Sequence, residues 1–242
     1  MEKVKCSASL QHPFTCIVSG PTQSGKTEWV LRLIENHKSM IEPSIQHIIF
    51  CYAEYQPKFE YLAKTISTRP SVKFTLHQGT PSRELIDGLS SAERKLLILD
   101  DLMEDAQQDD FIVELFTRGS HHRNPSILLI TQNLFTKGRH QRTISLNANY
   151  LVIMKNPRDR SQITYLARQI FPGKWRQIQD AYDAATARAH GYLFIDLTQN
   201  MDDRFRLRTN IFDEKRQGGK CVIFVPKVGG GGSGSRGMGR KV

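Results

Sequence analysis

The sequence predicts an α/β fold in which a central, mainly parallel β-sheet is covered by helices on both faces. Short apolar runs typical of buried strands alternate along the chain with stretches whose apolar residues recur at helical spacing. One of these runs leads directly into a glycine-rich loop, and a later run ends in two adjacent carboxylates. This alternation of strands and helices is typical of parallel strands joined by right-handed crossovers.

The first strand, loop and helix follow one another from Phe14 to His37. Residues 14–19 form an apolar, β-prone run, and residues 28–37 carry apolar side chains at helical spacing. The loop between them fits the phosphate-loop pattern G-x-x-x-x-G-K-[ST], in the residues Gly20, Pro21, Thr22, Gln23, Ser24, Gly25, Lys26 and Thr27. Its glycines let successive N–H groups point at one anion, and the helix N-terminus adds positive charge. We therefore expect ATP here, with Lys26 at the β- and γ-phosphates and the Thr27 hydroxyl on Mg²⁺.

The next elements lead to an acidic strand end. We expect a strand at 46–53, a helix opened by a proline at 57–66, a strand at 72–76 and a short helix at 82–88. The apolar run that begins at Lys95 then ends in Asp100 and Asp101. Ligands collect at the carboxyl ends of parallel strands, so Asp100 is the candidate acid on the Mg²⁺ side and Asp101 is the candidate to polarise the attacking water. An ordinary turn at a strand end also tolerates two aspartates.

A third strand is also expected to end in a polar side chain that belongs to the candidate site. The pattern predicts a helix at 107–118, a basic loop at 118–125 and a strand at 126–132. We expect Gln132 at the same edge of the sheet as Asp101, where an amide can hold the water or sense the γ-phosphate. The segment 133–147 that follows is expected to be basic and irregular.

The remaining patterns complete the fold. Strands are expected at 150–155 and 191–197, helices at 161–170 and 173–187, and peripheral strands at 204–209 and 221–226. We divide the chain into an N-terminal extension at 1–12, an ATPase domain at 13–228 and a flexible, basic, Gly/Ser-rich tail at 229–242.

Composition narrows the class of protein. The chain has 242 residues, of which 39% are hydrophobic, enough for one sizeable α/β domain. No apolar run is long enough to span a membrane and no secretory signal is visible, so an intracellular protein is expected. The formal net charge of +10 favours a polyanionic partner such as nucleic acid, although a solvated basic face gives the same charge.

The three strand ends together resemble a known superfamily. The Asp100-Asp101 strand end, the basic loop after it and the strand ending in Thr131-Gln132 resemble the FtsK-HerA superfamily of P-loop ATPases, which have a RecA-like fold. Within it, the segments 131–138 and 142–159 look most like the DNA-packaging ATPases of poxviruses and of Polinton or Maverick elements. The resemblance covers residues 14 to 197.

The resemblance implies roles for further residues. The loop at 20–27 matches the superfamily's Walker A motif, and Asp100-Asp101 matches its Walker B motif, where many relatives have Asp-Glu. Two residues, Arg118 and Arg123, match the position of an arginine finger that acts on a neighbouring subunit. The family works as pentameric or hexameric homo-oligomeric rings that thread double-stranded DNA, and a basic loop suits phosphate contacts. The candidates for DNA contact are Lys137, Arg139, His140 and Arg142.

These features favour an ATP-driven motor that packages a viral or virus-like DNA genome into a capsid, with a capsid or portal component as partner. The resemblance alone implies the host nucleus, a virus factory or the virion as its location. One alternative is a HerA-like translocase or helicase in replication or end processing. Another is a nucleotide-dependent switch, and a small-molecule kinase is a third. Asp101 and Gln132 argue against a pure switch, which needs no water-activating pair.

Overall fold

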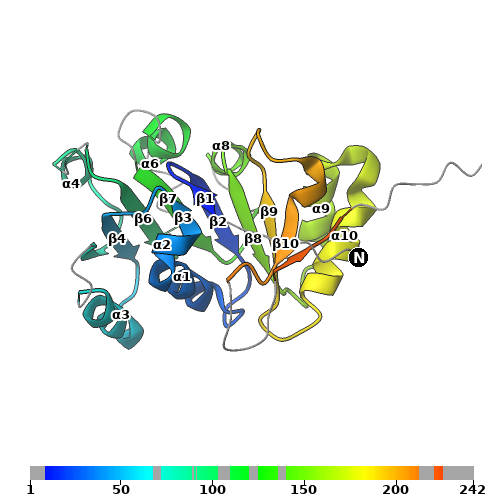
Figure 1. The fold of residues 1–242 in the computed structure, drawn as a ribbon, viewed down its shortest axis with the longest axis horizontal. Helices are drawn as coiled ribbons and strands as arrows, with labels where there is room; N and C mark the ends of the chain where they lie inside the picture. Colours follow the sequence, from blue (N-terminus) through cyan, green and yellow to red (C-terminus); the bar gives the residue numbers. More distant parts are fainter. Residues whose placement is uncertain are drawn as a thin grey trace, which may run out of the picture.

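The protein is described by a computed structural model that covers residues 9–67, 72–88, 90, 92–102, 110–119, 125–135, 140–212 and 221–225. Within these residues a nine-stranded sheet runs through the molecule in the order β11-β10-β9-β8-β2-β7-β6-β4-β5 (Figure 1). Its strands are β2 (Thr15–Ser19), β4 (His47–Tyr52), β5 (Lys73–Gln78), β6 (Lys95–Asp100), β7 (Pro125–Thr131), β8 (Tyr150–Met154), β9 (Tyr192–Asp196), β10 (Leu207–Thr209) and β11 (Val222–Ile223).

The sheet is parallel over most of its width. From β8 through β2, β7, β6 and β4 to β5, each neighbouring pair is parallel. The strands β9, β10 and β11 then extend the β8 side in antiparallel pairing. The predicted fold class, a mainly parallel sheet between helices, is therefore confirmed.

Helices pack on both faces of the sheet. The helices α1 (Lys26–Glu35), α2 (His37–Met40) and α3 (Pro57–Ser67) contribute buried side chains to one core cluster. The other cluster contains side chains of α4 (Arg83–Asp87), α6 (Asp110–Glu114), the π-helix η1 (Leu115–Gly119), α8 (Gln141–Leu146), α9 (Ser161–Ile170) and α10 (Trp175–Ala185). Two short 3₁₀ segments, η2 (Pro172–Lys174) and η3 (Asp203–Phe205), lie in the connections near α10 and β10.

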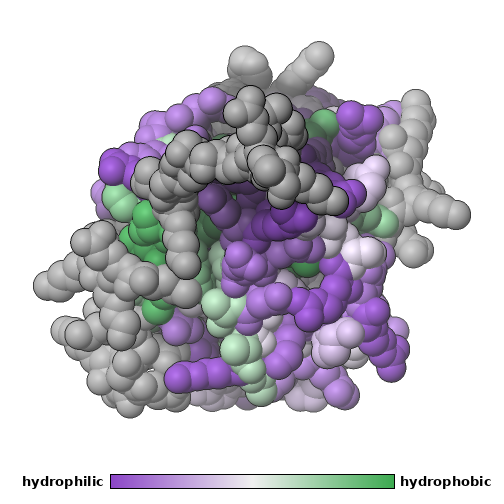
Figure 2. All heavy atoms as spheres, turned by 90° about the vertical axis from the view of Figure 1, so that its right-hand side faces the viewer, coloured by the Kyte–Doolittle hydropathy of each residue, from purple (hydrophilic) through white to green (hydrophobic). Residues whose placement is uncertain are grey.

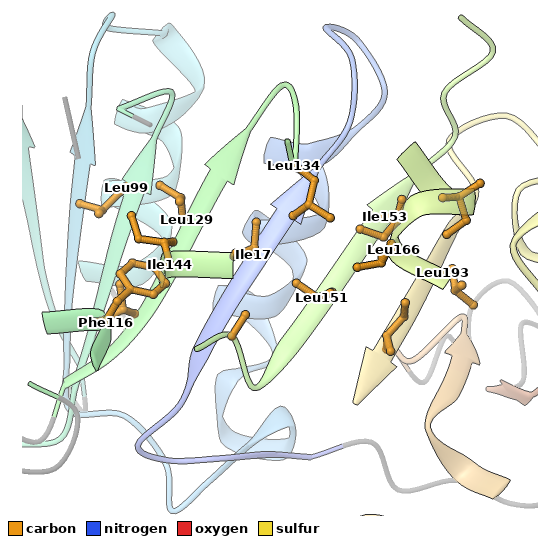
Figure 3. Close-up of a cluster of buried hydrophobic side chains, with 14 of the residues drawn as sticks. Ile17, Leu99, Phe116, Leu129, Leu134, Ile144, Leu151, Ile153, Leu166 and Leu193 are labelled. Carbon is orange, nitrogen blue, oxygen red and sulfur yellow. The ribbon is translucent and has the colours of Figure 1, made fainter. Parts of the chain in front are cut away.

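Alternation along each strand builds these two core layers. Successive side chains of a strand point to opposite faces, so Ile17 enters the cluster with α9 and α10 while Val18 enters the cluster with α1. Figure 3 shows the first layer, in which Ile17, Leu129 and Leu151 come from neighbouring strands. Burial of both faces explains why the middle positions of the central strands are apolar, for example from Cys16 to Val18 in β2 and from Leu96 to Leu99 in β6.

Three local features differ from the expected pattern. A turn of helix, α8, lies inside the segment expected to be irregular, and its buried Ile144 packs into the core. The strands β1 (Leu10–Gln11) and β3 (Ile41–Glu42) form a separate two-stranded parallel sheet. The expected helix at 107–118 is described as α6 followed by the π-helix η1. The elements α8, β1 and β3 are too short for side-chain periodicity to indicate them in the sequence.

Figure 2 views the molecule from the end that carries the antiparallel strands. Most of the coloured atoms on this face are hydrophilic, and smaller hydrophobic areas lie among them. In the described part of the chain, no helix combines the length and the apolar character needed to cross a membrane.

Candidate phosphate-binding and hydrolytic site

The glycine-rich loop connects β2 to α1 in a tight turn. Gln23 and Gly25 have φ values of 64° and 100°, and Gly25 is the residue that caps α1. Glycine adopts such backbone angles without strain, which makes Gly25 the natural residue at this turn. Gly20 is needed for space, because an added Cβ would lie 2.6 Å from Cβ of Met154 on β8. The loop therefore brings backbone N–H groups and the N-terminus of α1 to one point.

Lys26 lies over this loop. Its Nζ donates hydrogen bonds to the carbonyl oxygens of Gly20 at 2.6 Å and Pro21 at 3.0 Å. Burial lowers the pKa of Lys26, while the charges of Asp101 and Asp100 act in the opposite direction. The ammonium group is thus held at the loop, and the neighbouring carboxylates favour its charged form.

The strand order explains why three separate sequence segments meet here. Strand β7 lies between β2, which carries the loop, and β6, which carries the acids. Gly20 N donates to Thr131 O at 3.2 Å, and Asp101 N donates to Ile130 O at 3.3 Å. The carboxyl ends of β2, β7 and β6 therefore form one edge, and Gln132 follows the middle strand.

The two aspartates have different surroundings. Asp100 ends β6 and is only 7% exposed, and burial raises its pKa to about 6, against the opposing charges of Lys58 and Lys26. Asp101 is exposed, with a φ of 57°, a value uncommon for a residue other than glycine. The amide Nε2 of Gln132 lies 3.3 and 3.4 Å from the two carboxylate oxygens of Asp101. One acid is thus buried and the other is accessible and paired with an amide.

These residues line one cavity of about 360 Å³. Most of its lining was expected from the sequence: the loop residues from Thr22 to Thr27, Asp100, Asp101 and Gln132. Gln56 and Lys58, at the start of α3, also line it and were not expected. They belong there because β4 pairs with β6, with Tyr52 opposite Asp100, so that the chain leaving β4 enters at the same edge. The only sequence signal was their place just after a predicted buried strand.

The donor set fits a nucleotide with Mg²⁺. Mg²⁺ prefers oxygen ligands and is bound in such sites by one or two carboxylates together with phosphate oxygens. Thr27, which carries a hydroxyl, and Asp100, which carries a carboxylate, line the same cavity as Lys26. The residues present can therefore hold phosphates and a metal ion in the arrangement that the sequence predicts.

Other candidates are not brought into this cavity. Arg142 is exposed on α8 and does not line it. Arg118 lies in η1, where only its backbone is described. Arg123, Lys137 and Arg139 fall outside the described residues.

Comparison with known structures supports the fold. The genome packaging NTPase B204 from Sulfolobus turreted icosahedral virus 2, in complex with sulfate, matches with a TM-score of 0.51 at 12% identity, over 76% of this chain and 91% of that one. The same NTPase in complex with ATP-gammaS matches at 0.49 and 16% identity, over 76% and 92% of the chains. The cytoplasmic domain of the type VII secretion ATPase EccC from Thermomonospora curvata matches at 0.42 and 12% identity, over 57% and 20%. At these identities the first match shows a shared fold.

A sequence-family comparison is more specific. Residues 1–160 match the family model described as the poxvirus A32 protein, a stretch that includes the glycine-rich loop, both aspartates and Gln132. Curated protein sequences give no match. The expected resemblance to poxvirus-type packaging ATPases of the FtsK-HerA superfamily is confirmed, and the chain belongs to the poxvirus A32 protein family.

Proposed function

We propose that this protein is an ATP-hydrolysing DNA translocase that packages a viral or virus-like double-stranded DNA genome into a capsid. The observation that carries the proposal is the single cavity in which the glycine-rich loop, the buried Asp100 and the exposed pair of Asp101 and Gln132 meet. Membership in the poxvirus A32 family supports the packaging role.

The residues that line the cavity have different roles in ATP hydrolysis. The loop N–H groups and Lys26 bind the phosphates, for which Nζ exchanges its carbonyl partners for phosphate oxygens. Thr27 and Asp100 would hold Mg²⁺, which would supply positive charge beside the phosphates. Asp101 accepts a hydrogen bond from the attacking water and orients it, and Gln132 holds Asp101 and the water in place. Positioning and charge neutralisation supply most of the catalysis in phosphoryl transfer.

The pairing of Asp101 with Gln132 favours hydrolysis over a nucleotide-dependent switch. A switch needs only differential binding of the nucleotide, whereas an accessible carboxylate held by an amide next to the γ-phosphate position suits activation of water.

Assembly and DNA binding complete the proposal. Arg118 or Arg123 of one subunit serves as the arginine finger for its neighbour in a homo-oligomeric ring, a contribution worth on the order of 10³ to 10⁵ in rate. Lys137, Arg139 and Arg142 contact DNA phosphates, in keeping with the net charge of +10. A capsid or portal component receives the DNA, in a virus factory or virion.

A HerA-like translocase or helicase would use the same ATP site for a different purpose. Strand displacement on a tailed duplex distinguishes it from a packaging motor, which moves along duplex DNA without separating the strands.

Steady-state ATP hydrolysis with and without duplex DNA tests the proposal. We expect slow turnover that duplex DNA and subunit assembly increase, and we expect Lys26→Ala to abolish it while leaving the fold intact by circular dichroism. The assignment is wrong if the Lys26→Ala variant hydrolyses ATP like the wild type. The translocase role is wrong if the assembled wild-type protein hydrolyses ATP at a rate that DNA leaves unchanged.

A further inference from the structure

A second cavity lies on the other side of the glycine-rich loop. It has a volume of about 220 Å³ and shares Gly25 and Glu28 with the phosphate cavity. Its lining combines aromatic, apolar and charged side chains: Gly25, Glu28, Trp29, Arg32, Met154, His190, Tyr192 and Phe212. None of the roles proposed above uses this space.

The direction in which a bound nucleotide would extend from the loop places its base near this cavity. The γ-phosphate lies by Asp101 and Gln132, on the side of β2 where β7 and β6 follow. The ribose and base must then leave the loop at its opposite side. There the sheet continues with β8 and β9, whose ends Met154 and Tyr192 line the second cavity.

His190 is held against the loop by several constraints. Its φ is 55°, which is uncommon for a residue other than glycine. The next residue must be glycine, because a Cβ on Gly191 would lie 2.5 Å from the carbonyl oxygen of Ala185. The ring nitrogen Nδ1 lies 3.2 Å from Ser24 O, and a carbonyl only accepts, so Nδ1 carries the proton and donates. Backbone strain of this kind is typical of functional positions.

The remaining walls suit a flat, partly polar ligand. Trp29 packs against Phe212 with ring centroids 5.3 Å apart and against Tyr192 at 6.1 Å, which gives the cavity a rigid aromatic wall. The guanidinium of Arg32, on the last turn of α1, is ion-paired with Glu28 at 3.4 Å, and its side chain is 41% exposed. Planar guanidinium and imidazole groups both stack on the faces of aromatic rings.

We propose that this second cavity binds the purine base of ATP, with His190 and Arg32 as the side chains that contact it. The inference rests on the proposed function, because it takes the triphosphate to lie in the loop. The volume is below the roughly 300 Å³ at which pockets hold whole small ligands, so it suits one part of a nucleotide whose phosphates lie elsewhere.

Calorimetric titration of the full chain with Mg²⁺-ATP and with Mg²⁺-tripolyphosphate separates the base from the phosphates. The main variant is His190→Asn, since Asn tolerates a positive φ and keeps the turn while removing the ring. The second variant is Arg32→Ala. We expect each to weaken ATP binding by about fivefold to tenfold, the lower part of the range for stacking of a base, and to leave tripolyphosphate binding unchanged. Lys26→Ala, the matched control, should weaken both ligands.

The other possible results of this titration distinguish an error in the base site from an error in the proposed function. Unchanged ATP affinity in both variants would overturn the base site while leaving the proposed function standing. A parallel loss of ATP and tripolyphosphate affinity would also overturn it, because His190 would then act only by supporting the loop through Ser24. A wild-type protein that binds neither ligand would overturn the proposed function, and the base site with it.

Discussion

Asp100 combines burial with charge. Because it is 7% exposed, loss of water raises its pKa to about 6, even though Lys58 and Lys26 favour the ionised form. A carboxyl whose pKa is raised in the folded state stabilises the fold at low pH, and that stabilisation is lost as the pH rises through the folded pKa. Above pH 6 the ionised carboxylate therefore destabilises the nucleotide-free protein, by an amount on the order of 2 to 3 kcal/mol. A bound cation would relieve this cost.

The substitution Asp100→Asn tests this balance. We expect the free energy of unfolding of the nucleotide-free variant to exceed that of the wild type by about 2 kcal/mol at pH 8, with the difference disappearing toward pH 4, where the wild-type acid is protonated. Urea unfolding at several pH values measures it, and ATP hydrolysis should be lost at every pH. Asp180→Asn, at an exposed position of α10, is the control and should show no such trend. A stabilisation of Asp100→Asn that does not depend on pH would contradict the electrostatic explanation.

Individual site residues differ in how far the sequence predicts them. Lys26, Asp100, Asp101 and Gln132 could be placed at one edge because each follows an apolar run that forms a buried strand. Lys58 could not, since its place in the cavity depends on β4 pairing with β6, a long-range pairing that no local pattern indicates.

At the scale of elements, the strands of the central sheet were predicted most closely, and some of the short elements were missed. The strands β2, β4, β6, β7 and β8 were found within a few residues of their expected bounds. The helix α8 was missed because it has six residues in a basic segment, too few for a helical period to show. The order of strands in the sheet was also not predictable, because it is decided by packing between segments far apart in the chain.

One contact between elements ties the end of β8 to α10. The hydroxyl of Tyr182, a residue that is 4% exposed, donates to Met154 O at 3.0 Å and accepts from Asn156 N at 2.8 Å. Met154 in turn packs against Gly20 of the glycine-rich loop. The position of the loop therefore depends partly on a tyrosine of a distant helix.

We expect Tyr182→Phe to lower the free energy of unfolding by about 1 to 3 kcal/mol, because it leaves the half-buried N–H of Asn156 and the buried carbonyl of Met154 without the tyrosine hydroxyl. Urea unfolding measures the change. Tyr165→Phe is the matched control, since that tyrosine is 70% exposed on α9 and its substitution should change stability by less than about 0.5 kcal/mol. Equal effects of the two substitutions would show that the buried hydrogen bonds contribute nothing measurable.

At the scale of the whole molecule, ATP hydrolysis and DNA binding are proposed for different segments of the chain. Hydrolysis is assigned to the edge where β2, β7 and β6 end, and the proposed DNA contacts begin only a few residues beyond Gln132 along the chain. A change at the γ-phosphate could therefore reach the basic segment through the end of β7. A link of this kind between ATP turnover and movement of DNA is what the proposed motor requires.

The salt dependence of DNA binding tests where the duplex lies. Each phosphate contact adds about 0.9 to the slope of log K against log salt concentration, so replacing Lys137, Arg139 and Arg142 by alanine should reduce the slope by about 2 to 3. Fluorescence anisotropy with labelled duplex DNA at several salt concentrations measures it. A control with Lys38, Arg158 and Lys174 replaced removes the same charge from exposed positions elsewhere and should leave the slope nearly unchanged. If both variants lower the slope equally, the protein attracts DNA through its overall charge, and the segment after Gln132 has no special part in transmitting ATP turnover to the duplex.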